Sequence, residues 1–217
     1  MLPMSGRRRF ELEVAVLVPV KAFGDAKARL APVLSPEHRA RLARWTASRV
    51  VAAAGELPVF VTCDDDGVAE WAKSVGASVL WHPGEGLNAA VNGSVVELRD
   101  GGVRHVVIAH GDLPHAAALP SVARHDTITL VPDARCDGTN VLAMPTDAAI
   151  HLAYGVQSFS RHFAAALRSG LAVEVRHDPW LALDIDTPDD LSHPLVREVL
   201  PAWLPTNPVN RPFTTFR

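Results

Sequence analysis

Short apolar runs of strand length alternate with helical stretches along most of the chain, and this alternation constrains the fold more than any other feature. The first run, Val14–Val20, has no polar position. A run of this kind predicts a strand that is covered on both faces. Further strands are predicted at Val59–Thr62, Ser78–Trp81, Val106–Ala109, Thr127–Val131, Val141–Met144 and Ala172–Arg176.

Helices are predicted between these runs. Ser35-Pro36-Glu37 indicates an N-cap followed by a proline in the first turn, so a helix should begin there and end near Ala54. The other predicted helices are Val68–Val75, capped near Asp66, Leu87–Leu98 and Ser158–Ser169. Alternation of this kind is typical of an α/β fold, here a Rossmann-like three-layer sandwich with a mostly parallel, mixed sheet. Ligands of such folds bind beyond the carboxyl ends of the strands.

The chain of 217 residues fits one domain, predicted over 14–193. Residues 1–13 are interpreted as a leader that carries Arg7-Arg8-Arg9. Residues 194–217 hold five prolines, a density that predicts an irregular tail laid along the domain or against a partner.

Composition excludes several classes of protein. The net charge is −3 and no long basic block occurs, so nucleic acid is not an expected partner. The apolar runs are too short to cross a bilayer, and membrane association is not expected. Only Cys63 and Cys136 are present, without a C-x-x-C pair, which argues against disulfides and structural zinc and favours the cytoplasm.

The clearest candidate for chemistry is Asp184-Ile185-Asp186, near the end of the predicted domain. Residues two apart in an extended segment share a face, so the two carboxylates should project together with Ile185 buried opposite. Carboxylates held side by side repel each other unless a cation lies between them, and a hard divalent cation is the natural occupant. Thr187-Pro188 is predicted to begin a helix, and Asp189 and Asp190 are better explained as capping acids in its first turn, next to the helix dipole.

Two other strand ends carry charged residues. The segment after the first strand contains Lys21, Lys27 and Arg29, which would suit a polyphosphate, although a solvated basic loop explains them as well. It is not a Walker loop and it lacks G-x-G-x-x-G. Asp112 follows the predicted strand Val106–Ala109 within Gly111-Asp112-Leu113-Pro114, where it would either face the site or cap the next turn.

Anion sites are also predicted from a turn and from a helix start. Asp137-Gly138-Thr139-Asn140 is a turn whose Thr139 and amides could approach an anion. Ser158 opens a helix after Gly155, so it is either an anion-binding hydroxyl or a plain N-cap. His162 could face the same site, but a surface or half-buried position is favoured.

These segments together resemble the guanylyltransferases of coenzyme F420 biosynthesis, in order from about Val14 to Leu191. The motifs that carry the resemblance are Val18-Pro19-Val20-Lys21, Lys27-x-Arg29-Leu30, Leu87-Asn88, Asp112-Leu113-Pro114, Asp137-Gly138-Thr139-Asn140, Ser158-Phe159 with His162, and Asp184-Ile185-Asp186-Thr187-Pro188-x-Asp190-Leu191.

The resemblance implies a nucleotidyltransferase domain of the GT-A-like type that uses GTP and Mg²⁺. The acceptor would be a phosphorylated three-carbon acid, phosphoenolpyruvate or 2-phospho-L-lactate. Matching each motif position by position, the resemblance also implies which residues bind the metal and which bind the acceptor. The metal ligands would be Asp112, Asp184 and Asp186, and the acceptor would be held by Thr139, Gly155 and Ser158. Hand-off to the next transferase of the pathway and a homodimer are further expectations.

The chemistry expected from these residues is attack of an acceptor phosphate oxygen on the α-phosphorus of GTP. Both reactants are anions, so Lys21, Lys27 and Arg29 would act by neutralising charge. A phosphate monoester needs no general base at neutral pH. Two alternatives stay open: a nucleotide-sugar glycosyltransferase of the same fold, and a non-catalytic nucleotide-binding domain.

Overall fold

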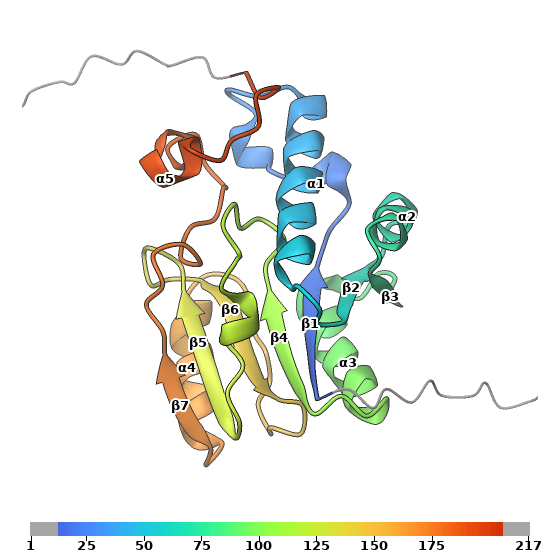
Figure 1. Ribbon diagram of the computed structural model, residues 1–217, viewed down its shortest axis with the longest axis vertical. Helices are drawn as coiled ribbons and strands as arrows, with labels where there is room; N and C mark the ends of the chain where they lie inside the picture. Colours follow the sequence, from blue (N-terminus) through green and yellow to red (C-terminus); the bar gives the residue numbers. More distant parts are fainter. Residues whose placement is uncertain (1–12, 206–217) are drawn as a thin grey trace, which may run out of the picture.

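A computed structural model describes residues 13–205, which form one mixed sheet with helices on both faces (Figure 1). The strand order is β3-β2-β1-β4-β6-β5-β7. The strands are β1 Val14–Pro19, β2 Val59–Cys63, β3 Ser78–Trp81, β4 His105–Ala109, β5 Thr127–Pro132, β6 Thr139–Pro145 and β7 Ala172–Val175. Each predicted strand is present, with shifts of one or two residues at some ends.

The sheet is parallel except at β6. Strand β6 runs antiparallel to both of its neighbours, β4 and β5, whereas the other strand pairs are parallel. The predicted α/β sandwich with a mostly parallel, mixed sheet is therefore confirmed. As a result, the carboxyl ends of β1 and β4 lie side by side at one edge of the sheet.

The longer helices match the predictions closely. They are α1 Pro36–Ala53, α2 Asp66–Ser74, α3 Gly86–Asp100 and α4 Ser158–Arg168. Ser35 is the N-cap of α1 and its hydroxyl accepts a hydrogen bond from the His38 amide. Asp65 rather than Asp66 caps α2, where it accepts from the Val68 amide at 2.9 Å. None of the helices in residues 13–205 has the length and apolarity needed to cross a bilayer.

Alternation along β1 explains why its apolar run has no polar position. Val16 and Val18 pack in the cluster formed with α1 and α2, while Ala15 and Leu17 pack in the cluster formed with α3 and α4. The front face of the sheet in Figure 1 carries α1, and α3 and α4 lie behind it. All four strand residues are fully buried, as expected for a strand between two layers.

The segment after residue 193 differs from the prediction. Instead of an entirely irregular tail, Pro194–Arg197 forms a short helix, α5. Its proline occupies the first turn, where the missing N–H has no helical partner to lose. Val196 and Leu204 pack with Leu30 and Leu42 in a third apolar cluster, so this part belongs to the folded body. Residues 1–12 of the predicted leader and 206–217 of the predicted tail lie outside the described residues.

Four short 3₁₀ turns complete the fold. They are η1 Phe23–Asp25, η2 Ala28–Leu30, η3 Leu119–Ser121 and η4 Asp190–Ser192. Turns η1 and η2 shape the segment that follows β1, and η4 shapes the segment that follows Asp186. These segments meet beyond the carboxyl ends of β1 and β4.

Candidate active site

Three aspartates converge beyond the carboxyl end of β4. One carboxylate oxygen from each of Asp112, Asp184 and Asp186 lies within 4.8 Å of the others. The two segments are joined by a backbone hydrogen bond of 3.3 Å, in which the Ile185 amide donates to the Asp112 carbonyl. The structure thus brings together all three residues for which the sequence predicted a metal-binding role.

The alternation predicted for the second segment is present, although residues 183–186 form no regular strand. Ile185 is completely buried, in the same apolar cluster as Leu30, and the aspartates that flank it both reach the acid cluster. Asp190 holds the turn that follows, because its carboxylate accepts from the Asp186 amide at 2.9 Å and the Thr187 amide at 2.6 Å. Asp190 therefore has the capping role that was predicted, whereas Asp189 makes no side-chain cap bond and only the short η4 turn Asp190–Ser192 forms where a helix was predicted.

Lys27 is the cation of the acid cluster. Its Nζ lies 3.1 Å from Asp112 Oδ2 and 3.2 Å from Asp186 Oδ1, and its side chain is 6% exposed. The backbone of Lys27 is left-handed, with φ 57°, which turns the chain between η1 and η2. Arg29 lies at the edge, with Nη1 3.9 Å from Asp186 Oδ2 and a mostly exposed side chain. Lys21 is exposed and makes no hydrogen bond or ion pair within residues 13–205.

Electrostatics distinguish the three carboxylates. Burial, reinforced by the charges of Asp112 and Asp186, raises the pKa of Asp184 to about 7. Burial also acts to raise the pKa of Asp112, but the ammonium of Lys27 and the other interactions of that carboxylate outweigh it and the pKa is lowered. Burial opposes the charge of Lys27, yet the two aspartates beside it keep its pKa above the ordinary value.

The cluster therefore fits a divalent cation. Asp112 Oδ1 is buried without a hydrogen-bond partner, and the raised pKa of Asp184, about 7, shows that its ionised form lacks compensating positive charge. The donor atoms are all carboxylate oxygens, which hard cations such as Mg²⁺ and Ca²⁺ prefer over nitrogen and sulfur. No other group of three or more possible ligands occurs in the described part of the chain.

A second polar cluster contains the residues for which acceptor binding was implied. The Thr139 amide donates to Ser158 Oγ at 3.1 Å, and the Ser158 amide donates to the Gly155 carbonyl at 3.0 Å. The reading of Ser158 as a plain N-cap is wrong, because Gln157 is the N-cap of α4 and makes no side-chain cap bond. The Ser158 hydroxyl serves Thr139 instead.

His162 is completely buried, which corrects the expectation of a surface or half-buried position. Its Nε2 accepts from the Ala153 amide at 2.9 Å, and its Nδ1 lies 3.0 Å from Thr139 Oγ1. Burial, aided by the charge of Arg161, lowers the pKa of His162 to about 4, so the ring is neutral. Since Nε2 is the acceptor, Nδ1 carries the hydrogen and donates to Thr139. The hydroxyl oxygens of Thr139 and Ser158 each accept one hydrogen bond in this cluster, and both side chains are buried.

Asn88 and Asn92 of α3 hold the loop between β6 and α4. The sequence did not reveal this role. Asn88 donates to the Tyr154 carbonyl at 3.2 Å and accepts from its amide at 2.7 Å. Asn92 makes the same pair of bonds with Leu152, at 2.8 and 3.0 Å. Their spacing of four residues on one helix face was the available signal. The result is a fixed approach of the chain to Gly155, whose φ of 117° suits glycine.

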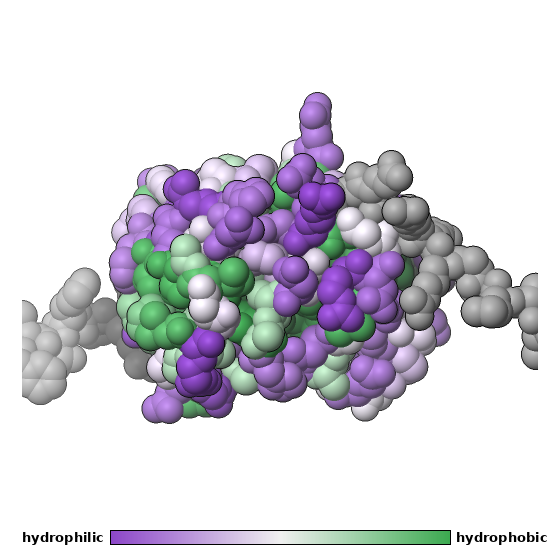
Figure 2. Space-filling view, turned by 90° about the horizontal axis from the view of Figure 1, so that it is seen from below, coloured by the Kyte–Doolittle hydropathy of each residue, from purple (hydrophilic) through white to green (hydrophobic). Residues whose placement is uncertain are grey.

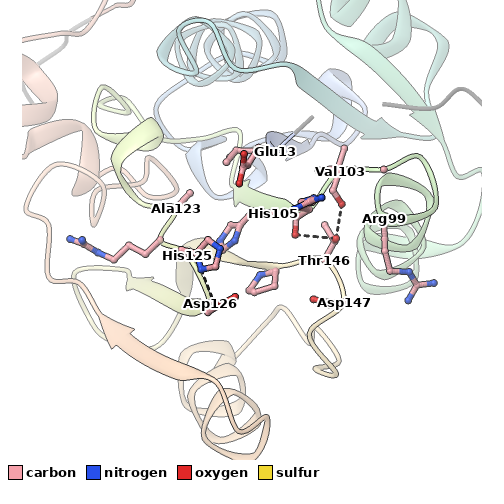
Figure 3. Close-up of a pocket in the computed structure, with 14 residues that line it drawn as sticks. Glu13, Arg99, Val103, His105, Ala123, His125, Asp126, Thr146 and Asp147 are labelled. Atoms are coloured by element: carbon pink, nitrogen blue, oxygen red, sulfur yellow. Dashed lines mark hydrogen bonds and ion pairs between the residues drawn. The ribbon is translucent and has the colours of Figure 1, made fainter. Parts of the chain in front are cut away.

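A broad hollow of about 1000 Å³ lies elsewhere, at the amino ends of the parallel strands (Figure 3). Its lining includes His105 and Thr146, and in the figure Arg99 extends away from them. This end of the molecule is seen in Figure 2, where hydrophilic residues dominate and a hydrophobic area lies to the left. The hollow holds no convergent acids, and ligands of α/β sheets bind at the opposite end. We therefore place the active site at the aspartates.

A fold of this type with three acids and a lysine beyond the central strands suits a nucleotidyltransferase, and it suits a nucleotide-sugar glycosyltransferase as well, so the comparisons with known proteins decide between them. Among solved structures, a nucleotidyl transferase from Methanothermobacter thermautotrophicus aligns with a TM-score of 0.60 at 15% identity, covering 86% of this chain and 96% of that one. At that identity the likeness concerns the fold. It agrees with the GT-A-like nucleotidyltransferase domain that the sequence predicted.

Residues 14–197 match the model of the family described as guanylyl transferase CofC like, and the chain belongs to that family. A phosphoenolpyruvate guanylyltransferase from Rubrobacter xylanophilus is 37% identical over 190 residues, covering 83% of this chain and 93% of the relative. A 2-phospho-L-lactate guanylyltransferase from Methanothermobacter thermautotrophicus is 30% identical, covering 83% of each chain. The suspected resemblance is thereby confirmed, and the chain is an enzyme of the nucleotidyltransferase class.

Proposed function

We propose that this enzyme transfers GMP from GTP to the phosphate of phosphoenolpyruvate and releases pyrophosphate, as a step of coenzyme F420 biosynthesis. The observation that carries the proposal is the meeting of Lys27 with Asp112, Asp184 and Asp186 at the carboxyl ends of the central strands. The names of the similar relatives support phosphoenolpyruvate as the first candidate acceptor and 2-phospho-L-lactate as the second.

We propose Mg²⁺ as the cation that the three aspartates would hold, where it would supply positive charge against the reacting phosphates. In the reaction, an oxygen of the acceptor phosphate forms a bond to the α-phosphorus of GTP while the bond to the pyrophosphate oxygen breaks. Lys27 and Arg29 lie on the side of Asp186 and would stabilise the negative charge that the leaving pyrophosphate gathers. Lys21, exposed at the end of β1, would act at longer range.

The second cluster would bind and orient the acid. Thr139 and Ser158 each retain a hydroxyl hydrogen for an acid oxygen, because their oxygens already accept bonds from His162 and from the Thr139 amide. Gly155 leaves space beside them, since the nearest atom to a Cβ built on it is Arg161 Nη2, at 3.7 Å. The reactive phosphate is already an anion at neutral pH, so no residue needs to remove a proton from it.

The decisive assay incubates the purified protein with GTP, Mg²⁺ and one acid at a time: phosphoenolpyruvate, 2-phospho-L-lactate or 3-phospho-D-glycerate. We expect pyrophosphate and a product with the mass of the acid joined to GMP, only when acid and metal are both present. Asp112→Asn should lower the rate by about a hundredfold. Asp100→Asn, at an exposed position on α3, is the matched control and should keep the rate. Turnover without metal, or none with any of the acids, would refute the proposal.

Three further predictions concern the setting of the enzyme. We propose that the enzyme works in the cytoplasm, that it forms a homodimer, and that it passes its product to the next transferase of the pathway. The two cysteines are free, Cys63 buried and Cys136 exposed, in keeping with a reduced compartment.

A further inference from the structure

Among the buried polar atoms of the described residues that have no hydrogen-bond partner, two belong to side chains in contact with each other: the Tyr154 hydroxyl and His110 Nε2. The Tyr154 side chain is almost completely buried, at 6% exposure. Burying a polar group without a partner costs free energy, and natural proteins leave few such groups. Where two of them occur together, a bound ligand is a physical reason for their presence.

The two side chains are in contact. The ring centroids of His110 and Tyr154 lie 5.0 Å apart with the planes tilted by 59°. His110 directly follows β4, where its amide donates to the Asn140 carbonyl at 3.1 Å, and it precedes Asp112 by two residues. His110 therefore contacts Tyr154 and belongs to the same strand-end segment as Asp112.

On its other side, Tyr154 contacts the second polar cluster. Its ring is perpendicular to that of His162, with centroids 4.8 Å apart and an interplanar angle of 72°. His162 in turn binds Thr139, whose amide binds Ser158. A continuous set of contacts thus leads from His110, two residues before Asp112, through Tyr154 and His162 to the residues proposed to hold the acid.

Tyr154 is also held in place and kept as a donor. Asn88 binds both backbone groups of Tyr154, so the residue has little freedom to move away from the site. Burial raises the pKa of its hydroxyl, which therefore keeps its proton. His110 offers a ring nitrogen without a partner. Together they offer a hydroxyl donor and a ring nitrogen to one ligand.

We propose that His110 and Tyr154 are further binding residues for the phosphorylated acid, with the Tyr154 hydroxyl donating to its carboxylate and His110 contacting it next to the aspartates. This inference rests on the proposed function. The carboxylate is the group assigned, because the phosphate must reach the aspartates and Lys27 in order to react. The pair lies on the β4–β6 side of Asp112, with Thr139, whereas the cationic segment that suits the nucleotide follows β1.

The test compares Tyr154→Phe with the wild type. The variant keeps the ring and its packing and removes only the hydroxyl. We expect the KM for phosphoenolpyruvate to rise about ten- to a hundredfold, as for loss of a hydrogen bond to a charged group, and the KM for GTP to stay unchanged. His110→Phe keeps a ring against Tyr154 and should shift the same constant in the same direction. The free energy of unfolding of the Tyr154 variant without ligands should be equal to the wild-type value or higher.

Ser94→Ala is the matched control. The Ser94 hydroxyl is another buried group without a partner, but it lies on α3 in the protein core. Its removal should affect stability in the same direction as Tyr154→Phe and leave both Michaelis constants unchanged. An effect on the KM of the acid in Tyr154→Phe but not in Ser94→Ala therefore reports on the site rather than on burial.

The outcomes separate this inference from the proposed function. If the wild type is active and Tyr154→Phe keeps the wild-type KM for the acid, the inference is wrong and the proposed function stands. A variant that is clearly less stable than the wild type would show that the hydroxyl has a protein partner, which also overturns the inference. If the wild type neither turns over any of the three acids nor gains thermal stability from them with Mg²⁺ present, both proposals fail.

Discussion

Replacing Asp184 by asparagine should stabilise the metal-free protein at alkaline pH. The side chain of Asp184 lies beside Asp112 and Asp186, and burial together with these charges raises its pKa to about 7 from an ordinary 3.8. Between these two values the unfolded chain has lost the proton and the native protein still holds it. The native state therefore becomes less stable, relative to the unfolded state, as the pH rises through this window.

The size of the effect follows from the two pKa values. A tenfold change in an acid constant corresponds to about 1.4 kcal/mol, so the full penalty above pH 7 is about 4 kcal/mol. Asp184 shares its titration with the neighbouring carboxylates, and we therefore expect to measure about 2 kcal/mol. The asparagine variant has the same shape but carries no charge, so it avoids this penalty.

The assay is urea denaturation of both proteins in a metal chelator, at pH 8 and at pH 5. The free energy of unfolding of Asp184→Asn should exceed that of the wild type at pH 8, with a smaller difference at pH 5. Replacing the chelator by Mg²⁺ at a hundred times its dissociation constant should add about 2.7 kcal/mol to the wild type. The variant should gain less, because it has lost a ligand.

Asp178→Asn is a control with the opposite expectation. The Asp178 carboxylate accepts from the Trp180 and Leu181 amides and pairs with Arg176, and these bonds outweigh burial to lower its pKa. Its amide variant should therefore be less stable at both pH values. If Asp184→Asn behaves like Asp178→Asn in the chelator, Asp184 is a structural residue and the reasoning about repelling carboxylates is wrong.

The remaining predictions concern the lysine, the acceptor cluster and the buried histidine. The Lys27→Met variant should bind Mn²⁺ about tenfold more tightly than the wild type in the absence of GTP, because a competing cation has left the carboxylates. Its turnover should be about a hundredfold slower. Weaker Mn²⁺ binding, measured by calorimetry, would contradict this. Thr139→Val and Ser158→Ala should each raise the KM for the acid about ten- to a hundredfold and leave that for GTP unchanged; equal shifts would remove them from the acceptor site. Folding lowers the pKa of His162 to about 4 from 6.5, so the protonated ring destabilises the native state. The free energy of unfolding should therefore decrease by about 3 kcal/mol as the pH falls from 6.5 to 4. Urea denaturation of His162→Gln should not show this decrease.

The strands and the acid cluster could be predicted because their signals are local. Apolar runs mark strands buried on both faces, and the strand-end rule places Asp112 at the carboxyl edge of the sheet. The alternation of Asp184, Ile185 and Asp186 needs only neighbouring residues. Local signals do not show which residues far apart in the sequence meet. The ion pairs of Lys27, with Asp112 at a separation of 85 residues and with Asp186 at 159, therefore come from the structure alone.

His162 shows why the second cluster was less predictable. A histidine on an amphipathic helix has no pattern of its own that tells burial from exposure. Its environment is set by partners distant in sequence, Thr139 on β6 and the Ala153 amide that Asn88 and Asn92 help to position. The same holds for Tyr154 and His110, whose contact requires the loop after β6 to return to the end of β4. Tertiary contacts of this kind leave no periodicity in the sequence.

Lys27 explains how three carboxylates can be kept together before any ligand binds. Without it, the energy of ionised Asp112 and Asp186 near Asp184 would oppose folding. Its ammonium lies 3.1 and 3.2 Å from two of them and offsets one of their two negative charges, and the proton of Asp184 removes the third charge. Asp112, Asp184 and Asp186 would hold a divalent cation in place of the ammonium and the proton, because each of them offers a carboxylate oxygen. Lys27 would then be free to neutralise charge on the phosphates, and we propose that the residue that stabilises the ligand-free acid cluster also contributes to catalysis.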